Sequence, residues 1–151
     1  LMLRDKLALA LKDSSKADDP VRFCTLRLVH AAIKDRDLAH RASGKDPVSD
    51  DDIGQILLKM LKQRKESSRL YEEKGRHDLA AQEREEMAVI REFLPAQLPE
   101  EKIREVCASV VEETGAQGLR DMGKCIETLK DRYSGQMDFS KASGVVKEML
   151  K

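Results

Sequence analysis

The chain has 151 residues, which is enough for one ordinary domain or two very small ones. Charged residues make up 37% and hydrophobic residues 40%, so the chain is polar but not compositionally disordered. Aromatic residues make up only 3%, which argues against a β-sandwich or barrel. Lys and Arg together number 28, as do Asp and Glu, so no overall charge indicates a nucleic-acid or membrane partner.

Hydropathy and cysteine usage indicate the compartment. No run approaches the roughly 18 apolar residues of a membrane span, and no basic-then-apolar signal segment stands at the start, so we expect no membrane association. The three cysteines, Cys24, Cys107 and Cys125, are too few and too scattered for a disulfide framework. We expect a cytoplasmic protein whose three thiols are reduced and buried as small apolar side chains.

Apolar residues recur at intervals of three and four along the whole chain, which predicts helices throughout. A short first helix is expected to end near Lys16. Asp19-Pro20 then opens the second helix, because Asp supplies a capping acceptor and Pro suits the first helical position. Ser49 begins the third helix, with Asp52 three residues on in a near capping box. Gly75 is expected to stop this helix.

Two prolines, Pro95 and Pro99, bracket the clearest boundary in the chain. A fourth helix stops before the first proline, and three shorter helices follow the second. We therefore predict an all-α protein in which a long antiparallel helix hairpin precedes a small three-helix bundle. The predicted parts are an N-terminal helical domain over 1–95, a linker over 96–99 and a C-terminal domain over 100–151.

Apolar character disappears from the middle of the third and fourth helices. If these helices form an antiparallel hairpin about Gly75, facing residues have numbers that sum to roughly 150, so Arg64 faces Glu86. We infer a polar network centred on Arg64, with bidentate guanidinium–carboxylate geometry. It either fixes the register of the two helices or forms a functional polar cleft. Its predicted members are Gln63, Arg64, Ser67, Glu83 and Glu86.

Six short segments, spread over nearly the whole chain, carry a resemblance. They are 25–28, 31–34, 62–67, 75–79, 93–98 and 121–124. In this order they resemble the GatB/YqeY family, specifically its stand-alone YqeY-like proteins. The resemblance implies an all-helical protein similar to the C-terminal region of the B subunit of the glutamine-dependent aminoacyl-tRNA amidotransferase, a region that contacts tRNA. Pro99 departs from the family, which usually has a capping Ser there, so we expect the start of the fifth helix to shift.

The sequence lacks the parts of the catalytic sites that this family association suggests. A glutaminase needs a nucleophile with a base and an oxyanion hole, and ATP use needs a Gly-rich phosphate loop or a metal-binding acidic set. Neither pattern is present, and the three histidines lack the spacing of a metal site. We predict no catalytic residue, no metal and no cofactor. One alternative is a carbon–nitrogen ligase with glutamine as amido donor, whose site would have to use Arg64, Glu83 and Glu86. Another is a purely structural adaptor.

Basic residues on the second and third helices remain as candidates for a binding surface. Arg27, Lys34 and Arg41 recur at intervals of seven on one face of the second helix. Interspersed opposite charges are equally typical of a solvated surface, and aromatic stacking platforms are absent. With the resemblance, the pattern predicts binding to tRNA or to a tRNA-amidation or translation protein, and no DNA partner. The candidate phosphate contacts are Arg27, Lys34, Lys62, Lys65, Arg69, Arg76, Lys124 and Lys130.

Overall fold

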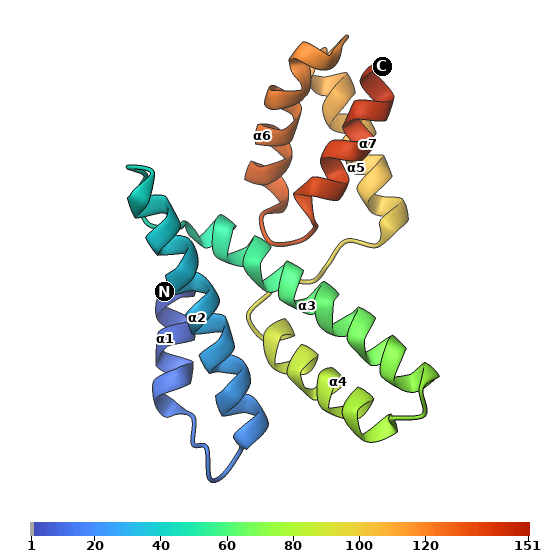
Figure 1. Cartoon of the computed structure of the whole chain (residues 1–151). Helices are drawn as coiled ribbons and strands as arrows, with labels where there is room; N and C mark the ends of the chain where they lie inside the picture. The colour runs from blue at the N-terminus through green and yellow to red at the C-terminus, as the bar shows by residue number, and fades with distance from the viewer. Residues whose placement is uncertain (1) are drawn as a thin grey trace. The chain divides into compact units, whose positions relative to one another are not determined.

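The computed structural model describes residues 2–151, and every regular element in them is helical (Figure 1). The absence of strands from these residues confirms the prediction of an all-α fold. The chain divides into two compact units, of which the first ends at Leu94 and the second comprises Pro95–Lys151. None of the helices in residues 2–151 is both long enough and apolar enough to cross a membrane.

Four helices build the first unit: α1 (Leu3–Asp13), α2 (Pro20–Ala42), α3 (Asp50–Glu73) and α4 (His77–Arg91). The most extensive contact is between α3 and α4, which lie side by side and are joined by a short turn (Figure 1). Gly75 in that turn has a φ of +74°, a left-handed conformation that glycine adopts without a Cβ clash. The α2 helix packs against α4, and α1 packs against α2 and α3.

The helix starts follow the capping signals of the sequence. The Asp19 side chain accepts a hydrogen bond of 3.1 Å from the backbone nitrogen of Arg22, at the start of α2. Ser49 and Asp52 form a reciprocal capping box at the start of α3, with both hydrogen bonds at 3.2 Å. Each cap satisfies backbone N–H groups that have no partner inside the helix. The first helix ends at Asp13, three residues earlier than expected.

Apolar stripes from α2, α3 and α4 meet in the core of the first unit. Their positions follow the three-and-four spacing of a helix face, and each side chain is at most 4% exposed. Burying a side chain of this size contributes about 1.5–3 kcal/mol, so this core is the main stabilising feature of the unit. The central residues are Leu26, Val29, Ile33, Ile53, Leu57 and Ile90.

The second unit is a bundle of α5 (Glu100–Thr114), α6 (Met122–Tyr133) and α7 (Phe139–Leu150), each of which packs against the other two. A single 3-10 turn, Leu119–Asp121, precedes α6. The α5 helix begins directly after Pro99, which provides no side-chain cap. Two of the predicted buried thiols, Cys107 and Cys125, are 0% exposed in the bundle core.

Residues 96–99, which the sequence predicts as a linker, are bonded to the second unit. The backbone nitrogen of Leu98 donates a hydrogen bond of 2.9 Å to the Gln136 carbonyl. The Gln97 side chain donates a hydrogen bond of 2.7 Å to the Gly135 carbonyl. Because Leu98 also packs against the bundle core, this segment forms one edge of the second unit.

The expected burial of Cys24 is wrong, because this thiol is exposed on α2. A helix turns about 100° per residue, so Cys24 lies roughly 200° around the axis from Leu26, which faces the core. A cysteine on the border of an apolar stripe can therefore face solvent when the stripe is narrow.

Replacing Ser49 with Ala should lower the free energy of unfolding by about 1 kcal/mol, because the capping box at the start of α3 is lost. Urea denaturation followed by circular dichroism measures the change. The matched control is Ser68→Ala on the same helix, where the hydroxyl donates only to the Lys65 carbonyl. We expect this control to leave stability unchanged or slightly higher. Equal losses for the two variants would contradict the assigned role of the cap.

Candidate anion-binding site

A charged pair joins α3 to α4 in the middle of the helix hairpin. The Arg64 Nη2 atom lies 3.9 Å from Glu86 Oε1, and each side chain is only 13% exposed. The two residue numbers sum to the value that the antiparallel register requires. The opposed polar interruptions of the two helices therefore mark a real interhelical contact.

The geometry of this pair is not the bidentate arrangement that the sequence predicts. Arg64 Nη1 donates a hydrogen bond of 3.2 Å to the Met60 carbonyl of its own helix. Arg64 Nε is buried and has no hydrogen-bond partner in residues 2–151. Because Arg64 Nη1 is hydrogen-bonded to the backbone of α3, the guanidinium makes only one long contact with Glu86, through Nη2.

The other predicted members of the network lie at its margin. Gln63 is exposed, and Ser67 is half-buried. Within the described chain, no ion pair joins Glu83 to Arg64, although Glu83 is close enough for its charge to act on Glu86. The predicted five-residue network is therefore a single pair, Arg64 and Glu86, with an additional negative charge nearby.

Burial dominates the electrostatics of Glu86. It raises the pKa of Glu86 above its ordinary value, Arg64 lowers the pKa, and the charge of Glu83 raises it further. A raised pKa in the folded state means that protonation of Glu86 favours the folded state. The stabilising effect of this protonation is present in acid and is lost as the pH rises through the folded-state pKa.

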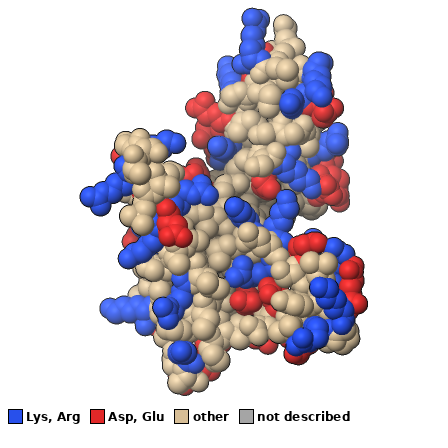
Figure 2. Space-filling model, viewed as in Figure 1, with Lys and Arg blue, Asp and Glu red and all other residues tan. Residues whose placement is uncertain are grey.

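Two of the predicted phosphate contacts are already paired with acids near the α3–α4 turn. Arg69 contacts Glu66 at 2.6 Å and Glu73 at 2.5 Å, and it holds the pKa of Glu66 below its usual range. The Arg76 Nε atom lies 3.5 Å from Asp78. Blue and red surfaces are intermixed around this turn in Figure 2. These two arginines therefore form part of a neutralised, solvated surface.

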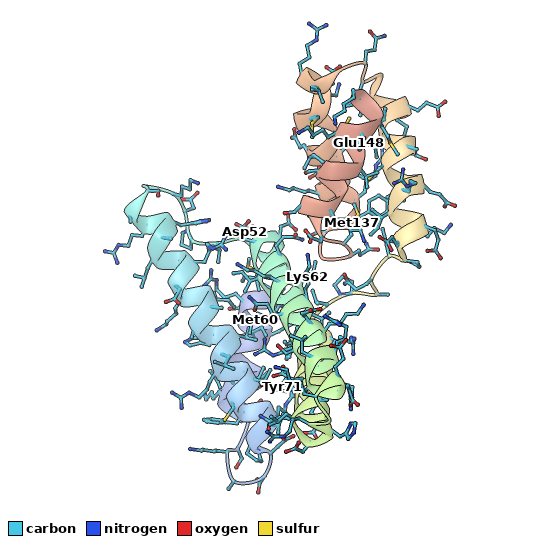
Figure 3. All side chains as sticks on the ribbon, turned by 45° about the vertical axis from the view of Figure 1, so that its right-hand side comes forward. Asp52, Met60, Lys62, Tyr71, Met137 and Glu148 are labelled. Carbon is cyan, nitrogen blue, oxygen red and sulfur yellow. The ribbon has the colours of Figure 1, made fainter. Side chains whose placement is uncertain are left out.

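The other predicted phosphate contacts form no ion pair with a carboxylate in the described chain. Arg27 lies over the Phe23 ring, 5.8 Å from its centroid, and Lys130 lies 6.0 Å from the Phe139 centroid in the second unit. Figure 3 shows Lys62 on a different side of α3 from the core residue Met60. The unpaired members are Arg27, Lys34, Lys62, Lys65, Lys124 and Lys130.

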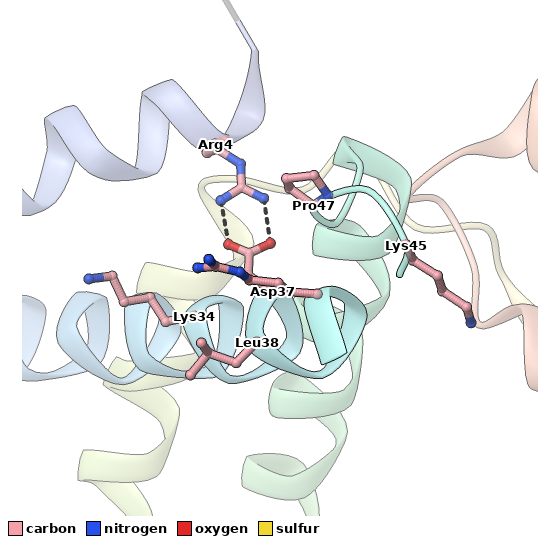
Figure 4. A pocket seen from close by; sticks show the side chains of 7 residues that line it. Arg4, Lys34, Asp37, Leu38, Lys45 and Pro47 are labelled. Carbon is pink, nitrogen blue, oxygen red and sulfur yellow. Dashed lines mark hydrogen bonds and ion pairs between the residues drawn. The ribbon is translucent and has the colours of Figure 1, made fainter. Parts of the chain in front are cut away.

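A second charged feature of the first unit begins with a bidentate bond between α1 and α2. The Arg4 guanidinium donates hydrogen bonds of 2.8 and 3.0 Å to the two carboxylate oxygens of Asp37 (Figure 4). Arg4 also donates a hydrogen bond of 2.9 Å to the Val48 carbonyl, and the Val48 nitrogen donates one of 3.0 Å to Asp37. This cluster, called here the Arg4–Asp37 clamp, ties two helices to the α2–α3 loop.

A cleft of about 600 Å³ opens beside the clamp. Three further cations line it: Lys34 and Arg41 from α2, and Lys45 from the α2–α3 loop. Leu38 and Pro47 supply apolar lining, and Lys34 and Lys45 lie on opposite sides of the clamp in Figure 4. Since Arg4 neutralises Asp37, the charges of the other three cations make the cleft a candidate site for an anion.

The clamp also fixes the protonation state of the one acid in the cleft. The Arg4 hydrogen bond, followed by the hydrogen bond from the Val48 backbone, lowers the pKa of Asp37 to about 2. Asp37 therefore remains ionised at every physiological pH and stays paired with Arg4.

Two of the residues that line the cleft are already singled out in the sequence, Lys34 as a candidate phosphate contact and Arg41 as a basic residue on the same face of α2. The sequence predicts no cleft here. Arg4, Asp37 and Lys45 come from three segments that only the fold brings together. The spacing of seven between Lys34 and Arg41, with the apolar Leu38 between them, was the available signal.

The contacts of the histidines and the grouping of possible metal ligands can be followed in residues 2–151. No group of three or more His, Cys, Asp or Glu side chains is placed to hold a metal ion in this part of the chain. His40 contacts the Asp46 carbonyl at 3.0 Å, and His77 contacts Glu72 at 2.7 Å, so neither of these rings is paired with a Cys or Ser side chain.

Comparison with known protein families identifies the family to which the chain belongs. The model of the YqeY-like protein family matches residues 4–150, nearly the whole chain. The chain therefore belongs to the YqeY-like protein family. No curated protein matches the sequence.

Replacing Arg64 with Met should lower the free energy of unfolding by about 1–3 kcal/mol at neutral pH, because Glu86 is left half-buried without a cation. The loss should shrink in mild acid, where Glu86 binds a proton and needs no counter-ion. The double variant Arg64→Met/Glu86→Leu should recover most of the loss, because both charges are then removed. Urea denaturation at two pH values measures these effects. Lys65→Met on the exposed side of α3 is the control, and a double variant as unstable as Arg64→Met would contradict the assignment.

The clamp should make the first unit sensitive to strong acid. Because the folded-state pKa of Asp37 is below its ordinary value, its stabilising effect is present above about pH 4 and is lost as the pH falls towards 2. Asp37→Asn should therefore be less stable than the parent protein at neutral pH, and the difference should disappear near pH 2. Thermal denaturation across this range tests the expectation, with the exposed Asp35→Asn as control. A difference that is independent of pH would show that the Asp37 charge is not responsible.

Proposed function

We propose that this chain is a helical, non-enzymatic tRNA-binding module, which contacts the phosphate backbone of tRNA through exposed cations on α2 and α3. Membership of the YqeY-like family and the resemblance to the tRNA-contacting region of an amidotransferase subunit support the proposal. Such a module would meet tRNA in the cytoplasm, a compartment compatible with three unpaired cysteines.

The observation that carries this proposal is the separation of paired from unpaired cations on α3. Arg64 forms an ion pair with Glu86, and Arg69 forms ion pairs with both Glu66 and Glu73. The exposed Lys62 and Lys65 have no ion-pair partner among the described residues. Their charges remain uncompensated, so an anionic polymer can use them without first breaking an ion pair.

The chemistry of these residues suits the sugar–phosphate backbone rather than the bases. Lysine is a flexible point charge that contacts phosphate without directional requirements. Backbone contacts give orientation and strong salt dependence but no reading of sequence. The proposed module therefore binds many tRNAs alike, and any selection would come from a partner protein or from tRNA shape.

The alternative of a glutamine-dependent carbon–nitrogen ligase has weaker support. Its site would have to use Arg64, Glu83 and Glu86. Arg64 and Glu86 are only 13% exposed and are directed at each other across the helix hairpin. Little of either side chain is therefore available to a substrate.

Gel-shift titration with bulk tRNA at two salt concentrations tests the proposal. Lys62→Gln/Lys65→Gln should weaken binding about five- to tenfold and reduce the slope of log affinity against log salt by roughly 2, because two phosphate contacts are lost. Arg69→Gln should change affinity less, because two carboxylates already share its charge.

Lys16→Gln provides the control for net charge, since Lys16 is exposed outside both α2 and α3. Failure of the parent protein to bind tRNA at low salt would reject the proposal. So would an equal loss of affinity for Lys16→Gln and the double variant, because binding would then depend on overall charge alone.

A further inference from the structure

We propose that the cleft beside the Arg4–Asp37 clamp is a nucleotide-binding site. Arg41 holds the phosphate ester, Lys34 and Lys45 supply the surrounding positive charge, and the apolar face of the nucleoside lies on Leu38 and Pro47. This site goes beyond tRNA binding by the surface of α3, and it does not require that function.

The first argument is the balance of charge around the cleft. Of the four cations that line it, only Arg4 is paired with an acid. Lys34, Arg41 and Lys45 form no ion pair in residues 2–151. A phosphate monoester carries a charge of about −1.5 to −2 at neutral pH, which matches this excess better than a single carboxylate does. The planar fork of an arginine also suits two oxygens of one phosphate.

The second argument is the apolar surface between the cations. Lys34, Leu38 and Arg41 are spaced at i, i+4 and i+7, so they share one face of α2. Leu38 is 63% exposed, although it lies among charged side chains. An inorganic anion would leave this apolar surface in water, whereas a nucleoside covers it while its phosphate remains beside the cations. The chemistry therefore favours an organic phosphate with a flat apolar part.

The third argument is the size and rigidity of the cleft. Its volume of about 600 Å³ lies within the usual range for small-molecule sites and accommodates a mononucleotide. The clamp fixes one wall through hydrogen bonds to Val48 of 2.9 and 3.0 Å. At the start of α1, the Leu3 nitrogen donates a hydrogen bond of 2.9 Å to Asp50 of α3. The backbone that carries the cations is therefore held in place before binding, and only the exposed side chains of Lys34, Arg41 and Lys45 have to become ordered.

A nucleoside phosphate can reach the cleft from two sources, a free nucleotide or a nucleotide of an RNA chain. Both present the same phosphate and the same flat base. The site chemistry does not depend on the source, and the experiment separates the two.

The test is titration of the full chain with adenosine 5′-monophosphate at low salt, monitored by calorimetry. Inorganic phosphate and adenosine are titrated separately as partial probes. We expect the nucleotide to bind about tenfold or more tightly than either partial probe, because only the nucleotide uses both the cations and Leu38. Arg41→Gln and Leu38→Ser should each weaken nucleotide binding about tenfold. Both positions are exposed, so the variants are expected to fold, and Lys16→Gln should bind as the parent does.

Bulk tRNA identifies the source. If tRNA displaces the nucleotide and loses affinity in Arg41→Gln, the cleft accepts a nucleotide of RNA. If the free nucleotide binds and tRNA does not compete, the cleft accepts a free nucleotide, and this holds even when tRNA fails to bind anywhere. If only tRNA binds, and its affinity is lost in both Arg41→Gln and Leu38→Ser, the cleft is a nucleotide-binding site whose ligand is part of an RNA chain.

Three results would overturn the inference. Nucleotide binding that is unchanged in Arg41→Gln and Leu38→Ser would place the ligand elsewhere. Equal affinities for phosphate and nucleotide would leave Leu38 without a role. The inference also fails if no nucleotide binds and if the affinity for tRNA is unchanged in Arg41→Gln and Leu38→Ser.

Discussion

The bidentate bond between Arg4 and Asp37 is the contact that ties α1 and the α2–α3 loop to α2 in the first unit. It joins residues 33 positions apart in the sequence, and the hydrogen bonds to Val48 extend it to the α2–α3 loop. Arg4 also neutralises Asp37, which is the only acidic residue among those that line the cleft. A structural contact thereby determines the electrostatic character of the surface beside it, because the remaining lysines and arginine are left without a local counter-ion.

Local signals in the sequence were sufficient to predict much of the fold. Asp19-Pro20 and the Ser49–Asp52 pair mark helix starts because each satisfies backbone groups within three residues of itself. The opposed polar interruptions predicted the contact between Arg64 and Glu86, since the register of an antiparallel hairpin follows from the position of its turn. The caps join residues only three positions apart, and the facing pair follows from the position of the hairpin turn. Both kinds of feature can therefore be predicted from one sequence.

The features that sequence reasoning missed depend on side-chain conformation or on distant segments. The Arg64–Glu86 pair is not bidentate, because the Met60 carbonyl competes for the same guanidinium. The separation of the basic residues into paired and unpaired groups depends on which carboxylate lies within reach, as Glu66 and Glu73 do for Arg69. The cleft requires α1, α2 and the following loop to meet, and no periodicity within one helix encodes that meeting. Only Lys34, and its face shared with Arg41, could be selected in advance.

The exposure of Cys24 has a practical consequence for studies of this protein. The other two thiols, Cys107 and Cys125, are 0% exposed inside the bundle of the second unit. A maleimide dye added to the folded protein will therefore react at one position, on the helix that also carries Lys34 and Arg41. Cys24 precedes Lys34 by ten residues, a rise of about 15 Å along α2. A fluorophore attached there is close enough to sense changes around the cleft, and it achieves single-site labelling without removing a native cysteine.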